Sequence, residues 1–258
     1  MKHPKLATTG VVLAAVLVAT GGCTAADRGD EPNPGRTSTG AAAEADPATV
    51  LADAAAKVDQ QTYRLTLGPG AGAGGDGTTL VWDPKGRRGL ETTALAVPNG
   101  TVTIERLTTG PDVYVKITAP DRRVPAWDGR TWWHVGAAST VRGSGLDTTR
   151  MASTLRTSAG VRRTGERAYA GTLDLRDSAA VLGEGVGGVL GDRAAAVPFT
   201  VRVDEQGRLV HYRIEFASDK GRASALDLAY ADFGLPVPAE RPAAELIGED
   251  PPSNIPGA

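Results

Sequence analysis

Cysteine is almost absent from this 258-residue sequence, which contains only Cys23. A single thiol excludes intramolecular disulfides and Cys-based metal sites. Histidine is also rare, with three residues, and the chain lacks H-x-x-H, EF-hand and G-x-S-x-G patterns. Lysine and arginine number 28 against 30 aspartates and glutamates. The composition therefore predicts no metal centre, no cofactor and no electrostatic surface for nucleic acid.

Long apolar runs are missing too, apart from one near the N-terminus. The basic start, Met1 to Lys5, precedes an uncharged apolar run from Leu6 to Ala19. A bilayer-spanning helix needs about 20 apolar residues, and this run is shorter and ends in Thr20-Gly21-Gly22-Cys23. A basic start, a short apolar run and small residues are typical of a secretory signal peptide. We expect residues 1–22 to be removed on export.

Cys23 follows small residues that resemble a lipobox, the recognition site of bacterial prolipoproteins. In that motif the thiol receives a diacylglyceryl group and becomes the first residue, although Thr20 stands where Leu or Val is usual. Two acyl chains anchor a protein stably, whereas one gives only marginal binding. We predict that Cys23 is lipidated and holds the chain at the outer face of the cell membrane. The alternative is a secreted protein that is cut elsewhere.

Residues 23–45 are predicted to be a flexible tether between the anchor and a folded domain. From Thr24 onward they are mostly small, polar or charged, so burial cannot offset the entropy of ordering them. A random coil of about 20 residues spans roughly 25 Å. Without residues 1–22, the chain keeps 26 basic and 30 acidic residues, a net charge of about −4 with histidine neutral.

The folded part begins with a helix signal and continues with strand-like alternation. Asp46-Pro47 combines an N-cap residue with proline at the first helical position, and the apolar spacing that follows predicts a helix to about Gln60. From Tyr63 onward, apolar and polar residues alternate between turn signals. The predicted strands cover residues 63–67, 79–82, 90–97, 101–107, 113–117, 130–135, 167–175, 199–203, 208–216 and 222–230.

Two more helices are predicted, over residues 144–158 and 177–196. The second contains Gly183, Gly185 and Gly188, which fit the G-x-G-x-x-G pattern of dinucleotide sites. Only eight residues separate Gly188 from Val197, too few for the helix that such a site requires. We interpret these glycines as positions where a helix packs closely or bends.

These elements predict an α+β fold. The expected architecture is one large curved antiparallel sheet, an incomplete barrel, with two or three helices on its concave face. We assign residues 46–235 to this domain and residues 236–258 to a proline-rich, mostly irregular tail.

The sequence does not predict an enzyme, because neither His134 nor His211 has a supporting catalytic pattern. The informative feature is the set of apolar side chains that alternate along the strands, where an apolar cleft beneath the helices would suit lipid acyl chains. Within residues 208–216, we expect Val210, Tyr212, Ile214 and Phe216 to share one face. The candidate lipid contacts on the sheet and helix faces are Val50, Leu51, Val58, Val113, Val115, Ile117, Trp133, Val210, Tyr212, Ile214, Phe216, Leu226 and Leu228.

Several short segments resemble a known family. They are the export signal with its lipobox, the helix from Asp46, Asp112-Val-Tyr-Val-Lys116, Gly129-Arg-Thr-Trp-Trp-His134, and Leu228 to Val237 followed by Arg241 to Leu246. Together they are similar to the LppX/LprAFG-like lipoproteins of high-GC Gram-positive bacteria, which share a fold with the LolA and LolB carriers.

The resemblance implies an incomplete barrel that encloses an apolar cavity for acylated lipids or glycolipids, with no catalytic residues. The glycine-rich segments at 68–77 and 183–191 depart from the family pattern. Two other functions remain open on the residues alone. One is a non-catalytic structural or interaction lipoprotein of the envelope, with a filled core and a protein partner. The other is an extracellular hydrolase built on a carboxylate pair or on His134.

Overall fold

The computed structural model describes residues 45–68, 77–120, 127–135, 147–177, 190–217 and 223–248. Residues Glu44–Ala258 form one compact unit by their internal contacts. The predicted signal peptide, Cys23 and the predicted tether up to residue 44 lie outside the described residues. The glycine-rich loop at 69–76, the glycine motif at 183–188 and the chain beyond residue 248 also lie outside them.

The predicted first helix is confirmed as α1 (Pro47–Val58). Asp46 caps it, because its carboxylate accepts a hydrogen bond from the Thr49 N–H at 3.0 Å. Pro47 occupies the first turn, where no hydrogen bond is lost. One face of the helix is buried, and it carries Leu51, Ala54, Ala55 and Val58.

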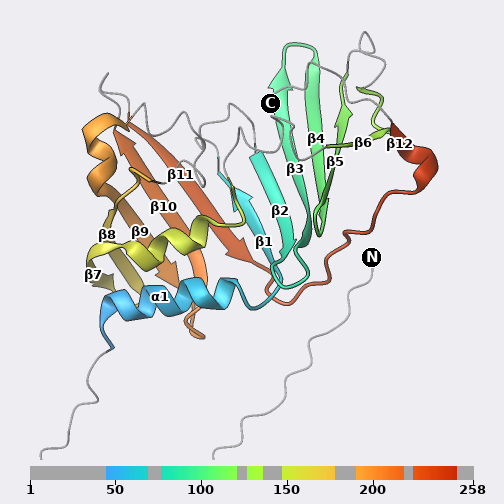
Figure 1. Ribbon diagram of the computed structural model, residues 1–258. Helices are drawn as coiled ribbons and strands as arrows, with labels where there is room; N and C mark the ends of the chain where they lie inside the picture. Colours follow the sequence, from blue (N-terminus) through green and yellow to red (C-terminus); the bar gives the residue numbers. More distant parts are fainter. Residues whose placement is uncertain are drawn as a thin grey trace, which may run out of the picture. The chain divides into compact units, whose positions relative to one another are not determined.

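A twelve-stranded sheet forms most of the described structure, with the order β12-β6-β5-β4-β3-β2-β1-β11-β10-β9-β8-β7 (Figure 1). The terminal strands of this order do not pair with each other, so the sheet is open and the predicted α+β fold is confirmed. The pairing is antiparallel except between β12 and β6, which makes the sheet mixed rather than purely antiparallel. The strands are β1 (Tyr63–Leu67), β2 (Gly77–Asp83), β3 (Arg88–Val97), β4 (Gly100–Thr109), β5 (Asp112–Thr118), β6 (Trp132–His134), β7 (Ala159–Gly165), β8 (Ala168–Leu173), β9 (Val197–Val203), β10 (Leu209–Ala217), β11 (Ala223–Ala231) and β12 (Ile247–Gly248).

Aspartates hold two of the turns that the sequence predicts. Between β2 and β3, the Asp83 carboxylate accepts hydrogen bonds from the backbone N–H of Lys85 at 3.1 Å and of Gly86 at 2.9 Å. Between β9 and β10, Asp204 accepts from the backbone N–H of Gln206 at 3.0 Å and of Arg208 at 2.8 Å. These are local side-chain bonds that replace a backbone turn.

The helix predicted over 144–158 is shorter and of another type. The described part is a 3₁₀ helix, η3 (Met151–Thr157), with Met151, Ala152, Thr154 and Leu155 buried. The hydroxyl of Thr154 donates to the Met151 carbonyl at 2.8 Å, and that of Ser153 donates to the Arg150 carbonyl at 2.6 Å. Hydroxyl bonds to carbonyls three residues back compete with α-helical bonding, and they favour the tighter turn.

Two further differences from the sequence predictions lie in this part of the chain. Of the helix predicted over 177–196, residues 178–189 lie outside the described residues, and the described end is a 3₁₀ helix, η4 (Gly191–Ala196). Strand β7 was not predicted, because Val161 is its only large apolar residue and nearly all of the strand is exposed. Among the described strands it forms one edge of the sheet and pairs with β8 alone.

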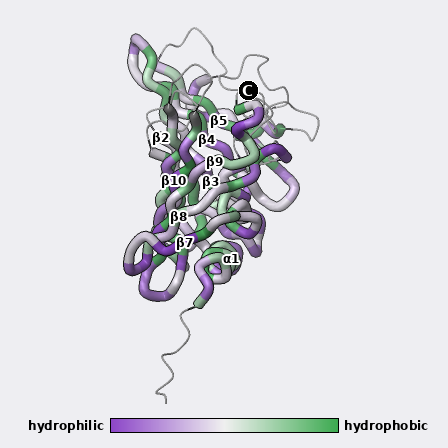
Figure 2. The backbone as a smooth tube through the Cα atoms, turned by 90° about the vertical axis from the view of Figure 1, so that its left-hand side faces the viewer, coloured by the Kyte–Doolittle hydropathy of each residue, from purple (hydrophilic) through white to green (hydrophobic). Residues whose placement is uncertain are grey.

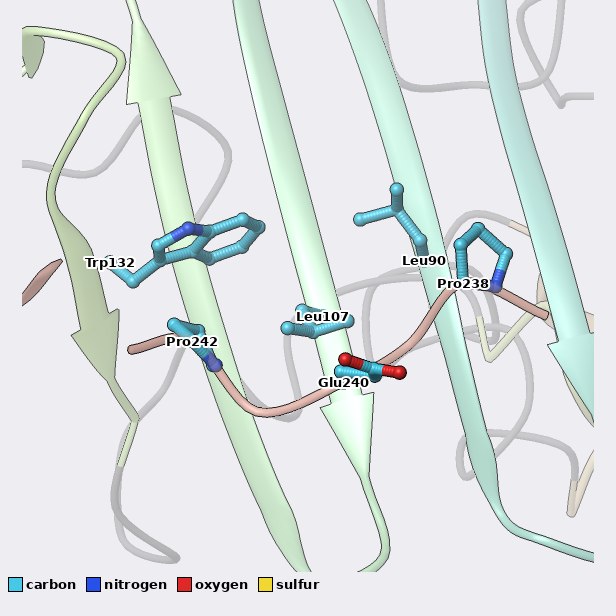
Figure 3. Close-up of a pocket in the computed structure, with 6 residues that line it drawn as sticks. All are labelled: Leu90, Leu107, Trp132, Pro238, Glu240 and Pro242. Atoms are coloured by element: carbon cyan, nitrogen blue, oxygen red, sulfur yellow. The ribbon is translucent and has the colours of Figure 1, made fainter. Parts of the chain in front are cut away.

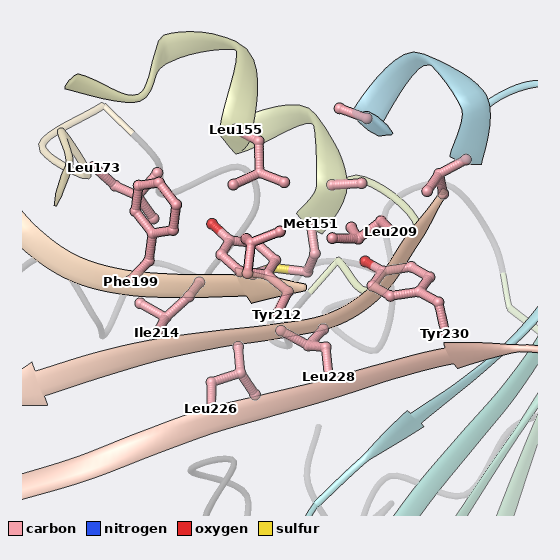
Figure 4. Close-up of a cluster of buried hydrophobic side chains, with 14 of the residues drawn as sticks. Met151, Leu155, Leu173, Phe199, Leu209, Tyr212, Ile214, Leu226, Leu228 and Tyr230 are labelled. Carbon is pink, nitrogen blue, oxygen red and sulfur yellow. The ribbon is translucent and has the colours of Figure 1, made fainter. Parts of the chain in front are cut away.

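The main core lies between the sheet and its helices. Both α1 and η3 cross the β7–β11 part of the sheet on one side, which we call the helix face (Figures 1 and 2). Tyr212 anchors this core, with its ring edge-on to Phe199 at 6.0 Å and its hydroxyl 2.7 Å from Thr154 Oγ1 (Figure 4). A third 3₁₀ turn, η5 (Ala244–Leu246), lies near the C-terminus.

A β-bulge contradicts the predicted face of Val210. In the pairing of β10 with β9, Leu209 lies opposite Val203 and His211 opposite Arg202, so Val210 is the extra residue. Leu209 is therefore buried in the core, while Val210 is half-buried and does not share the face of Tyr212 and Ile214.

The C-terminal segment 235–248, here called the strap, covers the opposite face of the sheet at β3–β6. Its Val237, Ala239 and Ile247 pack with Leu107 and Tyr114 in a separate apolar cluster. The strap begins where the Thr62 hydroxyl donates to the Leu235 carbonyl at 2.6 Å, and it ends as β12 beside β6. We call this side the strap face. The segment predicted to be a mostly irregular tail thus contributes a short helix and the last strand.

Candidate functional site

The helix face carries two apolar clusters, which differ in how they are covered. The first is the main core, where α1 packs mainly against η3, β7 and β10. Six predicted lipid contacts lie fully inside it, and Val50 and Phe216 lie at its border. In this cluster the predicted contacts pack against one another and against the helices. The six are Leu51, Val58, Tyr212, Ile214, Leu226 and Leu228.

The second cluster, here called the β3–β5 cluster, lies on the same face of the sheet. Its buried members are Val102, Val115, Ile117 and Val135. Strand register shows that the two clusters share one face. Leu80 of the core lies opposite Glu91 on β3, so both side chains point to the helix face. Alternate residues of a strand share a face, and Leu95 of the second cluster lies four residues after Glu91. The predicted common face of Val113, Val115 and Ile117 is confirmed.

The β3–β5 cluster has a rim that is only partly buried. In Figure 1, α1 and η3 lie over the other half of the sheet. The half-buried apolar residues packed against this cluster are Leu95, Val97, Ile104, Val113, Ala119 and Trp127. Accessible apolar surface of this kind is what a binding site for acyl chains requires.

A polar band separates the two clusters on the helix face. The Thr78 and Thr93 hydroxyls are 3.0 Å apart, and Arg106 Nη1 lies 3.4 Å from Glu91 Oε1. The buried Thr148, which precedes η3, donates its hydroxyl hydrogen bond to Glu91 Oε2 at 3.2 Å. The band fixes the segment before η3 to β3. It also places polar groups beside the accessible apolar rim.

Two tryptophans border the β3–β5 cluster. Trp133 lies opposite Val115 in the β5–β6 pair and is half-buried. The Nε1–H of Trp127 is buried and has no hydrogen-bond acceptor among the described residues. A buried donor without a partner costs free energy, so such a group is a natural partner for an oxygen of a ligand.

The sequence prediction missed part of this site. Leu95, Ile104 and Trp127 were not among the predicted lipid contacts, although Val102 and Ile104 alternate within the predicted strand 101–107. The alternation alone could have identified Ile104, whereas Trp127 lies outside the predicted strands. The apolar pattern of β4 is harder to interpret because the strand packs on both faces, with Leu107 on the strap face.

Neither His134 nor His211 lies on the helix face. His134 Nε2 is 3.0 Å from Asp112 Oδ1, and both side chains are nearly half exposed. By strand register, His134 lies opposite Tyr114, which packs on the strap face. His211 is 3.5 Å from Asp227 and lies between Leu209 and Tyr212 on the polar side of β10. A group of three or more His, Cys, Asp or Glu side chains that could hold a metal is absent from the described residues.

Three tyrosine side chains of the core have raised pKa values. Burial raises the pKa of Tyr63, Tyr212 and Tyr230, so all three hydroxyls stay protonated. The Tyr230 hydroxyl is buried without a hydrogen-bond partner among the described residues. These groups are therefore structural in the filled half of the helix face.

Within the described part of the chain, no helix is both long and apolar enough to cross a membrane.

The sequence matches no family model and no curated protein. The solved structures that are similar to this chain include two from mycobacteria. LprF from Mycobacterium bovis is 16% identical with a TM-score of 0.46, and the match covers 77% of this chain and 97% of LprF.

The second similar structure is the lipoprotein LppX from Mycobacterium tuberculosis. It is also 16% identical, with a TM-score of 0.43, and the match covers 76% of this chain and 100% of LppX. Both names occur in the family that the sequence motifs resemble. Because both identities are below 25% and both TM-scores below 0.5, neither structure assigns this chain to a family.

Proposed function

We propose that the chain is an exported lipoprotein, anchored through Cys23, that binds the acyl chain of a lipid on the β3–β5 cluster. The observation that carries this proposal is the accessible apolar rim formed by Leu95, Val97, Ile104 and Val113 beside the packed core. Apolar burial stabilises bound lipid by about 0.8 kcal/mol per methylene.

The polar groups next to the rim support an amphipathic ligand. The buried Trp127 N–H has no acceptor among the described residues and would gain one from an ester or hydroxyl oxygen of a ligand inserted beside it. The Glu91–Arg106 pair and the threonine pair offer polar contacts at the boundary of the apolar surface. The site thus combines an apolar rim with polar groups at its boundary. An acylated lipid or glycolipid, which joins an apolar chain to an oxygen-bearing head group, is therefore the proposed ligand.

The lipid-binding part is tested with a fluorescent acyl probe and with native mass spectrometry of protein extracted in mild detergent. We expect co-purifying lipid and saturable probe uptake. Ile104→Glu places a charge on the rim and should weaken probe binding at least tenfold, since burying an unpaired carboxylate is unfavourable. Val210→Glu is the matched control, because Val210 is half-buried on β10 and belongs to neither cluster.

Two outcomes contradict lipid binding at this site. One is a protein that is consistently empty and takes up no probe, which would favour an envelope interaction protein with a filled core. The other is equal probe affinity in Ile104→Glu and the wild type while both remain folded by circular dichroism.

The anchor is tested separately. Cys23→Ser should release the protein from the membrane fraction, and mass spectrometry of the N-terminal peptide should show a diacylglyceryl group on Cys23 in the wild type. An unmodified Cys23, or a wild-type chain already free in the medium, would refute the anchor without bearing on lipid binding.

A further inference from the structure

A small pocket lies on the strap face, on the side of the sheet away from the proposed lipid surface. It has a volume of about 300 Å³ and is lined by Leu90, Leu107, Trp132, Pro238, Glu240 and Pro242. In Figure 3, the strap crosses in front of β3–β5 and brings Pro238, Glu240 and Pro242 close to Leu90, Leu107 and Trp132. The volume is at the lower limit for small-ligand sites, so it suits one side chain rather than a lipid.

The walls of the pocket are apolar, and its one charged group is Glu240. This carboxylate forms no ion pair and no hydrogen bond among the described residues, and the side chain is exposed at the rim. The neighbouring cation Lys116 is already paired with Glu105 at 2.7 Å. Arg241 follows Glu240 in the chain, but it forms no ion pair with it. Glu240 therefore has no counter-ion among the described residues and can pair with a cation that a ligand brings.

Trp132 shows that this surface can hold an ammonium group. Lys116 Nζ lies 4.5 Å from the centroid of the Trp132 ring. A lysine side chain combines an ammonium group with an unbranched apolar stem, and such stems pack along apolar surface while the charge stays near water. Leu90 and Leu107 supply that apolar surface, and Glu240 supplies a counter-charge at the opening.

We propose that the pocket is a docking site for a lysine side chain presented by a partner polypeptide. The methylenes lie between Leu107, Leu90 and Trp132, and the ammonium group pairs with Glu240. A polypeptide is favoured over a free amine by Leu246, which is 44% exposed and is the only exposed large apolar side chain among the described residues. Leu246 precedes Ile247, which packs in the same strap-face cluster, so apolar surface for a partner continues beyond the pocket.

The test uses the full chain, purified in detergent and labelled with ¹⁵N-tryptophan. The Trp132 indole signal is assigned with Trp132→Phe. Three probes are titrated: a blocked Gly-Lys-Gly peptide, its Gly-norleucine-Gly counterpart, which keeps the stem without the charge, and n-butylamine, the stem and amine alone. We expect a saturable shift of the Trp132 signal with the lysine peptide, and weaker binding of butylamine and of the norleucine peptide. Glu240→Gln should weaken that binding about fivefold, the size expected of a partly exposed ion pair.

Glu245→Gln is the matched control, since Glu245 is exposed on the same segment and does not line the pocket. It should leave the lysine-peptide affinity unchanged. Equal shifts with the norleucine peptide, no shift with any probe, or an unchanged affinity in Glu240→Gln would each overturn the proposal. Binding of butylamine at least as tight as that of the lysine peptide would overturn the assignment to a polypeptide. Acyl-probe uptake, measured on the same samples, reports on the helix face independently.

Discussion

The two halves of the sheet are covered in opposite ways. Around β8–β11, the helix face is filled by α1 and η3, whereas the other face is polar, with Arg213 bonded to Asp227 at 2.5 Å. Around β3–β6, the helix face keeps an accessible apolar rim, and the strap covers the other face. One sheet therefore forms a packed core at one end and keeps an accessible apolar surface at the other.

The difference has a simple physical origin. Amphipathic helices cover a broad apolar face, because their buried residues recur every three or four positions, as Leu51, Ala54, Ala55 and Val58 do. The strap is extended and rich in proline, so it covers only a narrow line of side chains and leaves a pocket beside Trp132. The following experiments test this contrast, from the largest expected effect to the smallest.

Phe199→Ala in the filled half should reduce the free energy of unfolding by about 3–5 kcal/mol, because it leaves a cavity in a close-packed core. Ile104→Ala on the half-buried rim should cost at most about 2 kcal/mol, since less apolar surface is lost there. Urea unfolding followed by circular dichroism measures both. Equal costs would show that the two halves of the helix face are equally filled.

Thr154→Val should cost about 1–3 kcal/mol, because it leaves the buried Tyr212 hydroxyl without its partner at 2.7 Å. Adding Tyr212→Phe should recover part of this loss, since the unpaired group is then removed. Tyr230→Phe serves as the control and should be neutral or stabilising, as the Tyr230 hydroxyl already lacks a partner among the described residues. A loss in Tyr230→Phe equal to that in Thr154→Val would contradict the assigned contacts.

Ala239→Ser tests the narrow contact of the strap. Ala239 is buried in the strap-face cluster, and a hydroxyl there should cost about 1 kcal/mol unless it finds a partner. Ala243→Ser is the matched substitution at an exposed strap position and should change stability by less than about 0.5 kcal/mol. If both variants unfold at the same urea concentration, the strap does not pack as described.

The smallest effect concerns pH and compares one aspartate-held turn from each half. Burial opposes ionisation of Asp204, but hydrogen bonds from the Arg208 backbone and side chain lower its pKa overall. Backbone N–H groups of Arg130 and Thr131 lower the pKa of Asp128. A lowered folded pKa means that the stabilisation is present above the unfolded value of about 3.9 and is lost as pH falls through the folded pKa.

Asp204→Asn and Asp128→Asn should therefore lower the melting temperature near neutral pH, with Asp204→Asn having the larger effect, because Asp204 also pairs with Arg208 at 2.7 Å. Both differences from the wild type should shrink as the pH approaches 3. A difference that stays constant between pH 6 and pH 3 would show that these carboxylates do not act through their charge.

Local patterns predicted much of this fold. Asp46-Pro47 identified the start of α1, and strict alternation placed Val113, Val115 and Ile117 on one face. Alternation failed at Val210, because a bulge inserts one residue without any mark in the sequence. The η3 segment has helical apolar spacing, but hydroxyl bonds to its carbonyls tighten it into a 3₁₀ helix.

The candidate sites depend on pairings between segments that are distant in the sequence. The strap has no apolar period, so its contact with Leu107 and its pairing of Ile247 with Trp132 could not be predicted. The sequence identified the apolar strands that carry the proposed lipid surface. It did not indicate which half the helices leave uncovered, because that depends on how α1 and η3 pack across the whole sheet.

The pairing of β1 with β11 has a consequence for the order in which the chain folds. It joins the beginning and the end of the domain, and the Arg64–Asp232 ion pair beside it connects residues 168 positions apart. Closing so long a loop is slow, and the two halves of the sheet cannot join until nearly the whole domain is present. A chain threaded across a membrane from its N-terminus would thus remain incomplete until its last strands arrive, and it would close only on the far side.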